Sequence, residues 1–412
     1  KNGREFAESL ISSFDGRSEP QLVHIATDGE SYGHHHRHGD MALAFCHRYI
    51  ESHGLVQLTN YAQYMNLVEA DHEVEIHEDT SWSCYHGIER WKSNCGCGNE
   101  SGYHQRWRAP LRESLNWLRD RLKEVYKKEM AQYSDDPWGL RDKYIKVILN
   151  RKRETVDQFL TEHVKQPLDK DQKSLVIRLL EMQRQSLLMF TSCGWFFDEV
   201  SRIETVQILQ YANRAIQLAE RVSGVKLEEQ FVKMLAKAES NIAALKSAAT
   251  IYQTDIQPKR ISLTKVGMHY AVASLFDENP ERLRILNYSC ISDPYERYYA
   301  GVQILAIGKT SISSLVTLSQ KQFSFAVLYL GQHQIIGSAA DISEDTFDEM
   351  RSDIVHAFKE SRVYKVVDIM QQYFGGSNFS FFELFKDAQT KVLAKILGKN
   401  IEGATGVYKR IY

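Results

Sequence analysis

The fold is decided by the stretch Val23-His24-Ile25-Ala26-Thr27-Asp28-Gly29-Glu30-Ser31-Tyr32-Gly33-His34-His35-His36-Arg37-His38-Gly39-Asp40. Its first four residues are mostly apolar and β-favouring, which predicts a buried parallel strand. From Asp40 the apolar residues follow a helical spacing, so a helix is predicted over 40–53. Parallel α/β barrels place catalytic residues at the C-terminal ends of such strands, where Asp28 and Glu30 stand. A helix capped by Asp28, with a solvated Glu30, would explain the same residues without catalysis.

The string T-D-G-E-S-Y-G-H at Thr27–His34 resembles the fourth signature region of glycoside hydrolase family 57, a family of α-glucan enzymes. The resemblance implies a barrel strand before the loop and makes Asp28 the general acid/base of a retaining mechanism. Glu30 is then expected to orient a sugar hydroxyl or a neighbouring side chain. His34 or His35 is expected to reach another sugar hydroxyl, since consecutive histidines point apart and cannot all bind one metal ion.

A second resemblance to family 57 lies at Ser192–Glu199, S-C-G-W-F-F-D-E, and continues into 205–214. It is similar to the helical fifth region, whose aromatic and acidic residues close over the barrel mouth, and so implies substrate contacts for Trp195 and Asp198. The segments 81–91 and 379–387 resemble a family-57-related subgroup with a long C-terminal region.

Trp82 and His86 complete the set of expected substrate-binding residues. Flat aromatic faces stack on the apolar face of a pyranose, and tryptophans in an irregular polar segment are candidates for that role. Core packing is the alternative for each of them, Trp195 included.

The six cysteines are irregularly spaced, which is typical of reduced thiols rather than of a disulfide framework. Cys84, His86, Cys95 and Cys97 offer soft ligands that suit zinc, but their spacing matches no standard zinc knuckle. Structural zinc and buried thiols beneath an aromatic loop both remain open. We favour the thiols, and therefore expect no metal and no cofactor.

The composition is that of an ordinary globular protein: 43% of the 412 residues are hydrophobic and 25% are charged. The formal net charge of −2 gives no general basic field, so nucleic acid is not an expected partner. No run is long enough for a membrane span and no signal peptide opens the chain, so a cytoplasmic location and no membrane partner are expected.

The predicted fold class is α/β plus α: the end of a parallel β/α barrel, then a helical bundle and a small antiparallel β module. The expected domains are the last part of the barrel with an aromatic loop (1–109), the bundle (110–260), the β module (261–345) and C-terminal helices (346–412). One helix is expected to begin at Asp198, and another is expected to run over 227–252. Strands are expected at 284–291, 298–307 and 323–330 from their residue content and alternation.

One strand cannot form a barrel, and the family-57 nucleophile stands on an earlier strand. We therefore expect an N-terminal part of the same protein to supply that strand, and the isolated chain to be inactive. The expected function is the acid/base-bearing part of a retaining α-glucan hydrolase or glucanotransferase, acting on an α-glucan or oligosaccharide. Two alternatives stay open: a non-catalytic carbohydrate-binding or scaffolding protein, and a metal-dependent polysaccharide deacetylase.

Overall fold

The computed structural model describes residues 2–98, 100, 102–332, 334–375, 378–381, 384–386, 389–390, 393–394 and 397–398. The chain divides into two compact units, Lys1–Glu78 and Asp79–Tyr412. Among the described residues, no helix combines the length and the apolar character that crossing a membrane requires.

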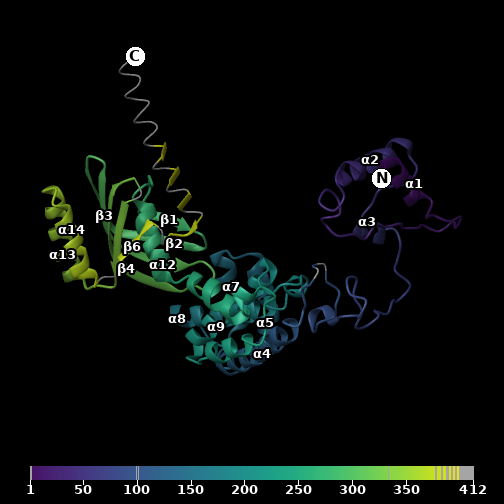
Figure 1. Cartoon of the computed structure of the whole chain (residues 1–412), viewed down its shortest axis with the longest axis horizontal. Helices are drawn as coiled ribbons and strands as arrows, with labels where there is room; N and C mark the ends of the chain where they lie inside the picture. Colours follow the sequence, from purple (N-terminus) through teal and green to yellow (C-terminus); the bar gives the residue numbers. More distant parts are fainter. Residues whose placement is uncertain are drawn as a thin grey trace, which may run out of the picture. The chain divides into compact units, whose positions relative to one another are not determined.

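The first unit is built on two helices that pack side by side (Figure 1), α1 (Gly3–Ile11) and α2 (Gly39–His53). Ala7, Cys46 and Ile50 form their small common core. A short helix, α3 (Tyr61–Met65), follows. The helix predicted from Asp40 is therefore confirmed, with its start one residue earlier.

The strand predicted at Val23–Ala26 is not formed within the described residues, and Ile25 is 41% exposed. A strand needs a neighbouring strand to satisfy its backbone groups, and this unit holds no such neighbour among its described residues. The barrel to which this strand was assigned stays a prediction.

The second unit begins with a segment that we call the irregular loop, the described residues from 79 to 107. It contains the short 3₁₀ helix η1 (Glu89–Trp91). A helical bundle follows: α4 (Arg108–Met130), α5 (Pro137–Lys143), α6 (Ile145–Leu149), α7 (Arg153–His163), α8 (Lys170–Leu188), η2 (Ser192–Trp195), α9 (Ile203–Ser223), α10 (Glu228–Leu235), η3 (Ala243–Leu245), α11 (Ala248–Ile251), η4 (Tyr252–Ile256) and η5 (Gln257–Lys259). The leucines of α4 recur at helical spacing and form an apolar stripe that lies in the core.

Two helix predictions in the bundle were wrong. α9 begins at Ile203 rather than at Asp198, because the Asp198 carboxylate accepts hydrogen bonds from the irregular loop. The helix predicted over 227–252 breaks after α10, where Ser240 and Asn241 donate hydrogen bonds to the Glu199 carboxylate. In both places a contact distant in sequence competes with the local helical preference.

A six-stranded antiparallel sheet forms the rest of the second unit, with its strands in sequence order. The strands are β1 (Arg282–Ile285), β2 (Tyr288–Ala300), β3 (Gln303–Ser314), β4 (Gln320–Gly331), β5 (Gln334–Ala340) and β6 (Asn378–Ser380). The single strands predicted over 284–291 and 298–307 were wrong, because each range contains a tight turn, at Leu286 and Gly301, where φ is positive. The strand predicted over 323–330 is confirmed as part of β4.

Helices cover both faces of this sheet (Figure 1): α12 (Leu263–Ser274) on one, α13 (Glu344–Lys359) and α14 (Val363–Phe374) on the other. Successive side chains of β4 point to opposite faces, so Phe325 packs with α12 whereas Ala326 packs with α13 and α14. The second unit is thus a mixed helical and antiparallel structure. Residues from 399 onward, which belong to the expected C-terminal helices, lie outside the described residues.

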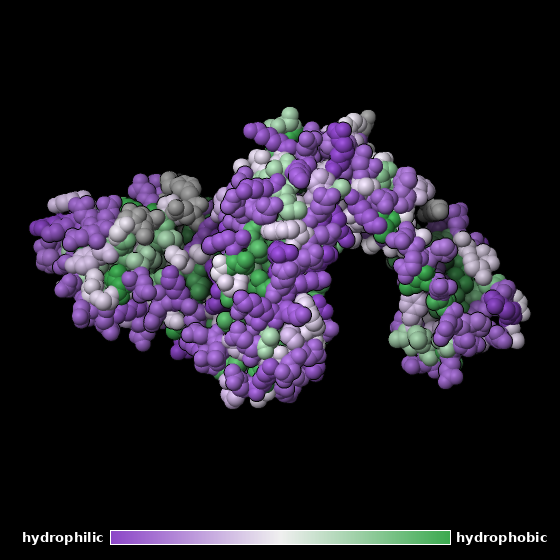
Figure 2. Space-filling model, turned by 90° about the horizontal axis from the view of Figure 1, so that it is seen from below, coloured by the Kyte–Doolittle hydropathy of each residue, from purple (hydrophilic) through white to green (hydrophobic). Residues whose placement is uncertain are grey.

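Hydrophilic residues cover most of the face drawn in Figure 2, and the apolar residues there lie in separate small groups. This agrees with an ordinary globular composition, in which single exposed apolar residues are common.

Candidate functional site

The Asp28 loop, residues 27–38, is exposed and held by short-range hydrogen bonds. The Ser31 backbone N–H donates to the Asp28 carbonyl oxygen at 3.0 Å, and the Thr27 hydroxyl donates to the Ser31 hydroxyl at 2.7 Å. α2 is preceded by His38, whose side chain makes no capping hydrogen bond. Asp28 is therefore not the cap of this helix, and its carboxylate lies at the surface.

Glu30, His34 and His35 extend from the same loop into solvent. The Glu30 carboxylate lies 3.7 Å from Nε2 of His35, and the rings of His34 and His35 meet edge to face with their centroids 5.1 Å apart. Gly33 has a φ of 120°, which a residue with a Cβ rarely adopts, and this allows the sharp turn. The structure thus gathers an exposed carboxylate pair and two imidazoles on one loop.

Trp82 and Trp195 occupy opposite environments in the second unit. Trp82 is 77% exposed on the irregular loop, as an aromatic platform requires. Trp195 is fully buried, stacked on Phe190 with its centroid 6.4 Å away, and the Arg112 guanidinium lies 5.3 Å from its ring centroid. Trp195 presents no face to solvent, so the geometry supports packing, and its expected substrate contact stays a prediction.

Asp198 is also buried and organises the irregular loop. It accepts hydrogen bonds from the Glu100 backbone N–H at 2.8 Å and from Nε2 of Gln105 at 3.0 Å. The indole N–H of Trp107 donates to the Asp198 carbonyl oxygen at 2.8 Å. These hydrogen bonds hold the irregular loop against the segment before α9, so Asp198 has a structural role. Its expected substrate contact stays a prediction.

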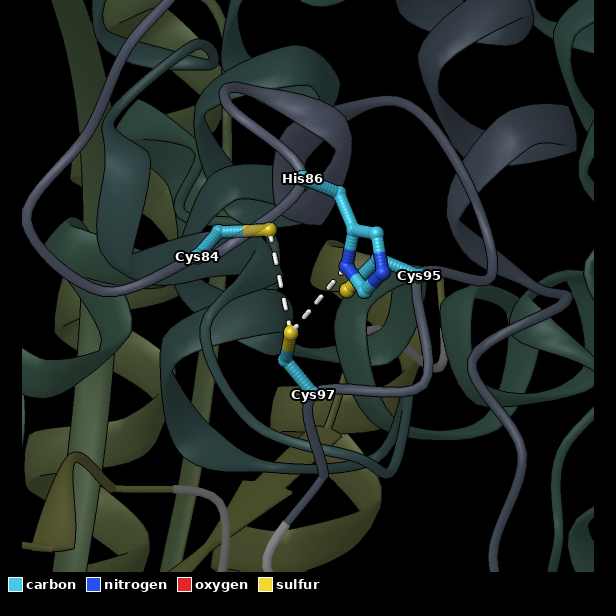
Figure 3. A group of neighbouring side chains, drawn as sticks. All are labelled: Cys84, His86, Cys95 and Cys97. Atoms are coloured by element: carbon cyan, nitrogen blue, oxygen red, sulfur yellow. Dashed lines mark hydrogen bonds between the residues drawn. The ribbon is translucent and has the colours of Figure 1, made fainter.

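The irregular loop also brings together a set that we call the cysteine–histidine cluster: Cys84, His86, Cys95 and Cys97 (Figure 3). Their ligand atoms all lie within 4.8 Å of one another. Sγ of Cys84 is 3.9 Å from Sγ of Cys97, which in turn is 3.4 Å from Nδ1 of His86. A disulfide would require about 2.05 Å between sulfur atoms, so these are free thiols.

Two buried arginines pack against the cluster. Arg90 donates to the Ser83 carbonyl oxygen at 2.9 Å and to the Phe196 carbonyl oxygen at 2.6 Å. Arg108, fully buried, donates to Sγ of Cys95 at 3.3 Å. Burial lowers the pKa of the Arg108 guanidinium, and the neighbouring Cys95 sulfur acts in the opposite direction.

The pKa of the Cys84 thiol is lowered to about 7. Burial acts against this shift, but hydrogen bonds from the backbone N–H groups of His86 and Arg90 outweigh it, together with the neighbouring thiols. The sequence contained the signal for this cluster in its four soft ligands. The loop conformation that brings these four side chains together could not be predicted from the sequence.

A second feature is a cavity of about 550 Å³ between the bundle and the sheet, which we call the arginine-lined cavity. Its lining includes Arg151, Arg184, Arg214, Arg260, Glu181 and Gln210. Its volume falls within the range of about 300–1,000 Å³ that is usual for small-molecule sites. No residue of this cavity was expected in a site from the sequence.

A family model described as a domain of unknown function, DUF3536, matches residues 103–385. The match covers more than half of the chain, and the chain therefore belongs to the DUF3536 family. It includes the bundle and the sheet, whereas the Asp28 loop and the cysteine–histidine cluster precede it. No curated protein and no solved structure matches the chain.

Proposed function

We propose that this chain carries the acid/base residue of a retaining α-glucan hydrolase or glucanotransferase related to glycoside hydrolase family 57. The observation that carries the proposal is the T-D-G-E-S-Y-G-H loop, whose Asp28 carboxylate is exposed and does not cap α2. Membership of the DUF3536 family is compatible with this proposal and assigns no activity of its own.

The chemistry requires two carboxylates about 5–5.5 Å apart. Asp28 protonates the departing glycosidic oxygen and then takes a proton from the incoming water or sugar hydroxyl. Glu30, next to His35, positions a hydroxyl of the sugar. We expect the second carboxylate, the nucleophile, on a barrel strand that pairs with Val23–Ala26, and we assign it to no residue named above.

Replacing Asp28 by Asn in the full-length protein tests this role. We expect turnover on an α-glucan to fall by a factor of at least about 100, because general acid/base catalysis contributes about 10²–10⁴. Asp40→Asn is the matched control: Asp40 is also exposed, but it lies in the first turn of α2. Its turnover is expected to stay close to that of the wild type. Equal turnover of the wild type and Asp28→Asn would contradict the assignment.

Non-catalytic carbohydrate binding is a second candidate, favoured by the arginine-lined cavity, whose guanidinium and amide groups can donate to sugar hydroxyls. In that case Gln210→Ala would weaken binding of a malto-oligosaccharide in calorimetry, whereas Asp28→Asn would leave it unchanged. The acid/base proposal predicts instead that Asp28→Asn lowers turnover and that Gln210→Ala leaves turnover unchanged. A metal-dependent deacetylase needs a metal site. Among the described residues, the only three or more potential ligands that lie close enough to share an ion form the cysteine–histidine cluster, which contains no carboxylate.

A further inference from the structure

The cysteine–histidine cluster brings four ligand atoms close enough to share one metal ion. A zinc ion at about 2.3 Å from sulfur and 2.0–2.1 Å from nitrogen sets edges of about 3.8 Å between two sulfurs and about 3.5 Å between sulfur and nitrogen. The corresponding distances are 3.9 Å from Cys84 to Cys97 and 3.4 Å from Cys97 to His86. The four side chains point toward one common space (Figure 3).

The local backbone explains how such short spacings converge. Cys84 and His86 are separated by Tyr85, whose side chain is fully exposed and therefore fills none of the space between the ligand atoms. Cys95 and Cys97 are separated by Gly96, whose φ of 78° bends the chain so that both sulfurs face the first pair. Four ligands can therefore converge in this loop without the spacing of a standard zinc knuckle.

The donor set selects the metal. Three thiolates and one imidazole are soft to borderline ligands, which suit zinc and not the oxygen-seeking magnesium or calcium. The four protein ligands fill all positions of a tetrahedral ion, as in structural sites, and leave none for substrate or water. A cluster of several iron atoms would need ligands that lie further apart than these do.

Charge also favours an ion at this place. Zn²⁺ with three thiolates and a neutral imidazole carries a net charge of −1. Arg108 is fully buried, and its guanidinium donates to Sγ of Cys95 and to the carbonyl oxygens of Phe196 and Phe197. None of these partners carries a full negative charge while the thiols are protonated. The Asp198 carboxylate is a negative charge near this guanidinium, and a thiolate-bound ion adds another directly at the Cys95 sulfur.

We propose that Cys84, His86, Cys95 and Cys97 bind one structural zinc ion that joins the two arms of the irregular loop. The described part of this loop, between residue 79 and α4, has η1 as its regular secondary structure. A metal cross-link of its arms would hold it against α4 and the segment before α9, where Arg90 and Asp198 already hold it. The proposal assigns His86 to the metal in place of the expected substrate contact, and it does not depend on the role of Asp28.

The test is metal analysis of the purified full chain by elemental mass spectrometry. We expect one zinc ion per chain after extensive desalting. Cys97→Ser should lower the zinc content to well below half, whereas Cys193→Ser, a change of an exposed cysteine outside the cluster, should retain it. Cys97→His keeps a zinc ligand at the same position and should restore much of the binding, which separates ligand loss from misfolding.

Cobalt gives a second readout. Co²⁺ added to the metal-free chain should produce the visible bands of tetrahedral thiolate coordination, and added zinc should abolish them. No stoichiometric metal in the wild-type chain, iron or copper in place of zinc, or a disulfide between two of the three thiols would each overturn the proposal.

Discussion

At the scale of single residues, His269 on α12 shows how burial sets a proton affinity. Its side chain is buried, and Nδ1 makes no hydrogen bond within the described part of the chain. The ring packs against that of Phe385 with centroids 4.9 Å apart. Burial lowers the pKa of His269 from 6.5 to about 4, because a charged imidazole is poorly solvated there.

The free energy of unfolding should therefore fall as the pH is lowered from about 6.5 to about 4. In this interval the unfolded chain binds a proton at His269 that the folded chain excludes, so the stabilisation is complete above pH 6.5. The total loss is about 3 kcal/mol at 1.36 kcal/mol per pKa unit. Urea unfolding at pH 7.5 and 5 should show about 2 kcal/mol of this loss. His269→Leu should flatten this dependence, whereas His356→Gln, at an exposed position, should not. Equal slopes for wild type and His269→Leu would refute the attribution.

At the scale of elements, Glu181 on α8 joins three segments of the bundle. Its carboxylate is buried and accepts hydrogen bonds from the Tyr144 hydroxyl and from the Arg151 guanidinium, both at 2.7 Å. Arg184 lies 3.5 Å away on the same helix. Burial, followed by the Glu181 charge, raises the pKa of Tyr144, so its hydroxyl stays a donor.

Glu181→Gln should lower the free energy of unfolding at pH 7 by about 2 kcal/mol, within the range for hydrogen bonds to a charged group, because two partly exposed guanidinium groups lose their negative partner. Urea unfolding monitored by circular dichroism measures the change. The control is Glu229→Gln, which removes an exposed pair with Lys233 on α10 and should leave the midpoint unchanged. A midpoint for Glu181→Gln equal to that of the wild type would contradict the account.

Local patterns predicted α2 and the middle of β4, where the apolar residues follow a regular spacing. They did not predict the turn at Gly301, because alternation continues through a two-residue hairpin. The break after α10 depends on hydrogen bonds to Glu199, more than forty positions away in sequence. Convergence of the cysteine–histidine cluster likewise depends on the loop shape, which Arg90 holds through the distant Phe196 carbonyl. Single-sequence periodicity contains no information on such contacts.

At the scale of the whole molecule, the first unit carries the loop with Asp28, and the second carries the cluster, the bundle and the sheet. The central proposal concerns the first unit: Asp28 acts there as the acid/base carboxylate of a retaining α-glucan enzyme. A retaining mechanism makes this claim testable, because the acid/base residue also activates water in the second step.

The most direct measurement is azide rescue of full-length Asp28→Ala with an α-glucoside that has an activated leaving group. Such a leaving group departs without an acid, so the glycosyl–enzyme ester forms but water is not activated to cleave it. Azide needs no base: its nitrogen bonds to the anomeric carbon, the ester bond breaks, and the nucleophile carboxylate is released. The account predicts faster turnover with azide in Asp28→Ala alone, and an α-glycosyl azide product. An active wild-type protein whose Asp28→Ala variant gives no acceleration and no glycosyl azide would contradict it.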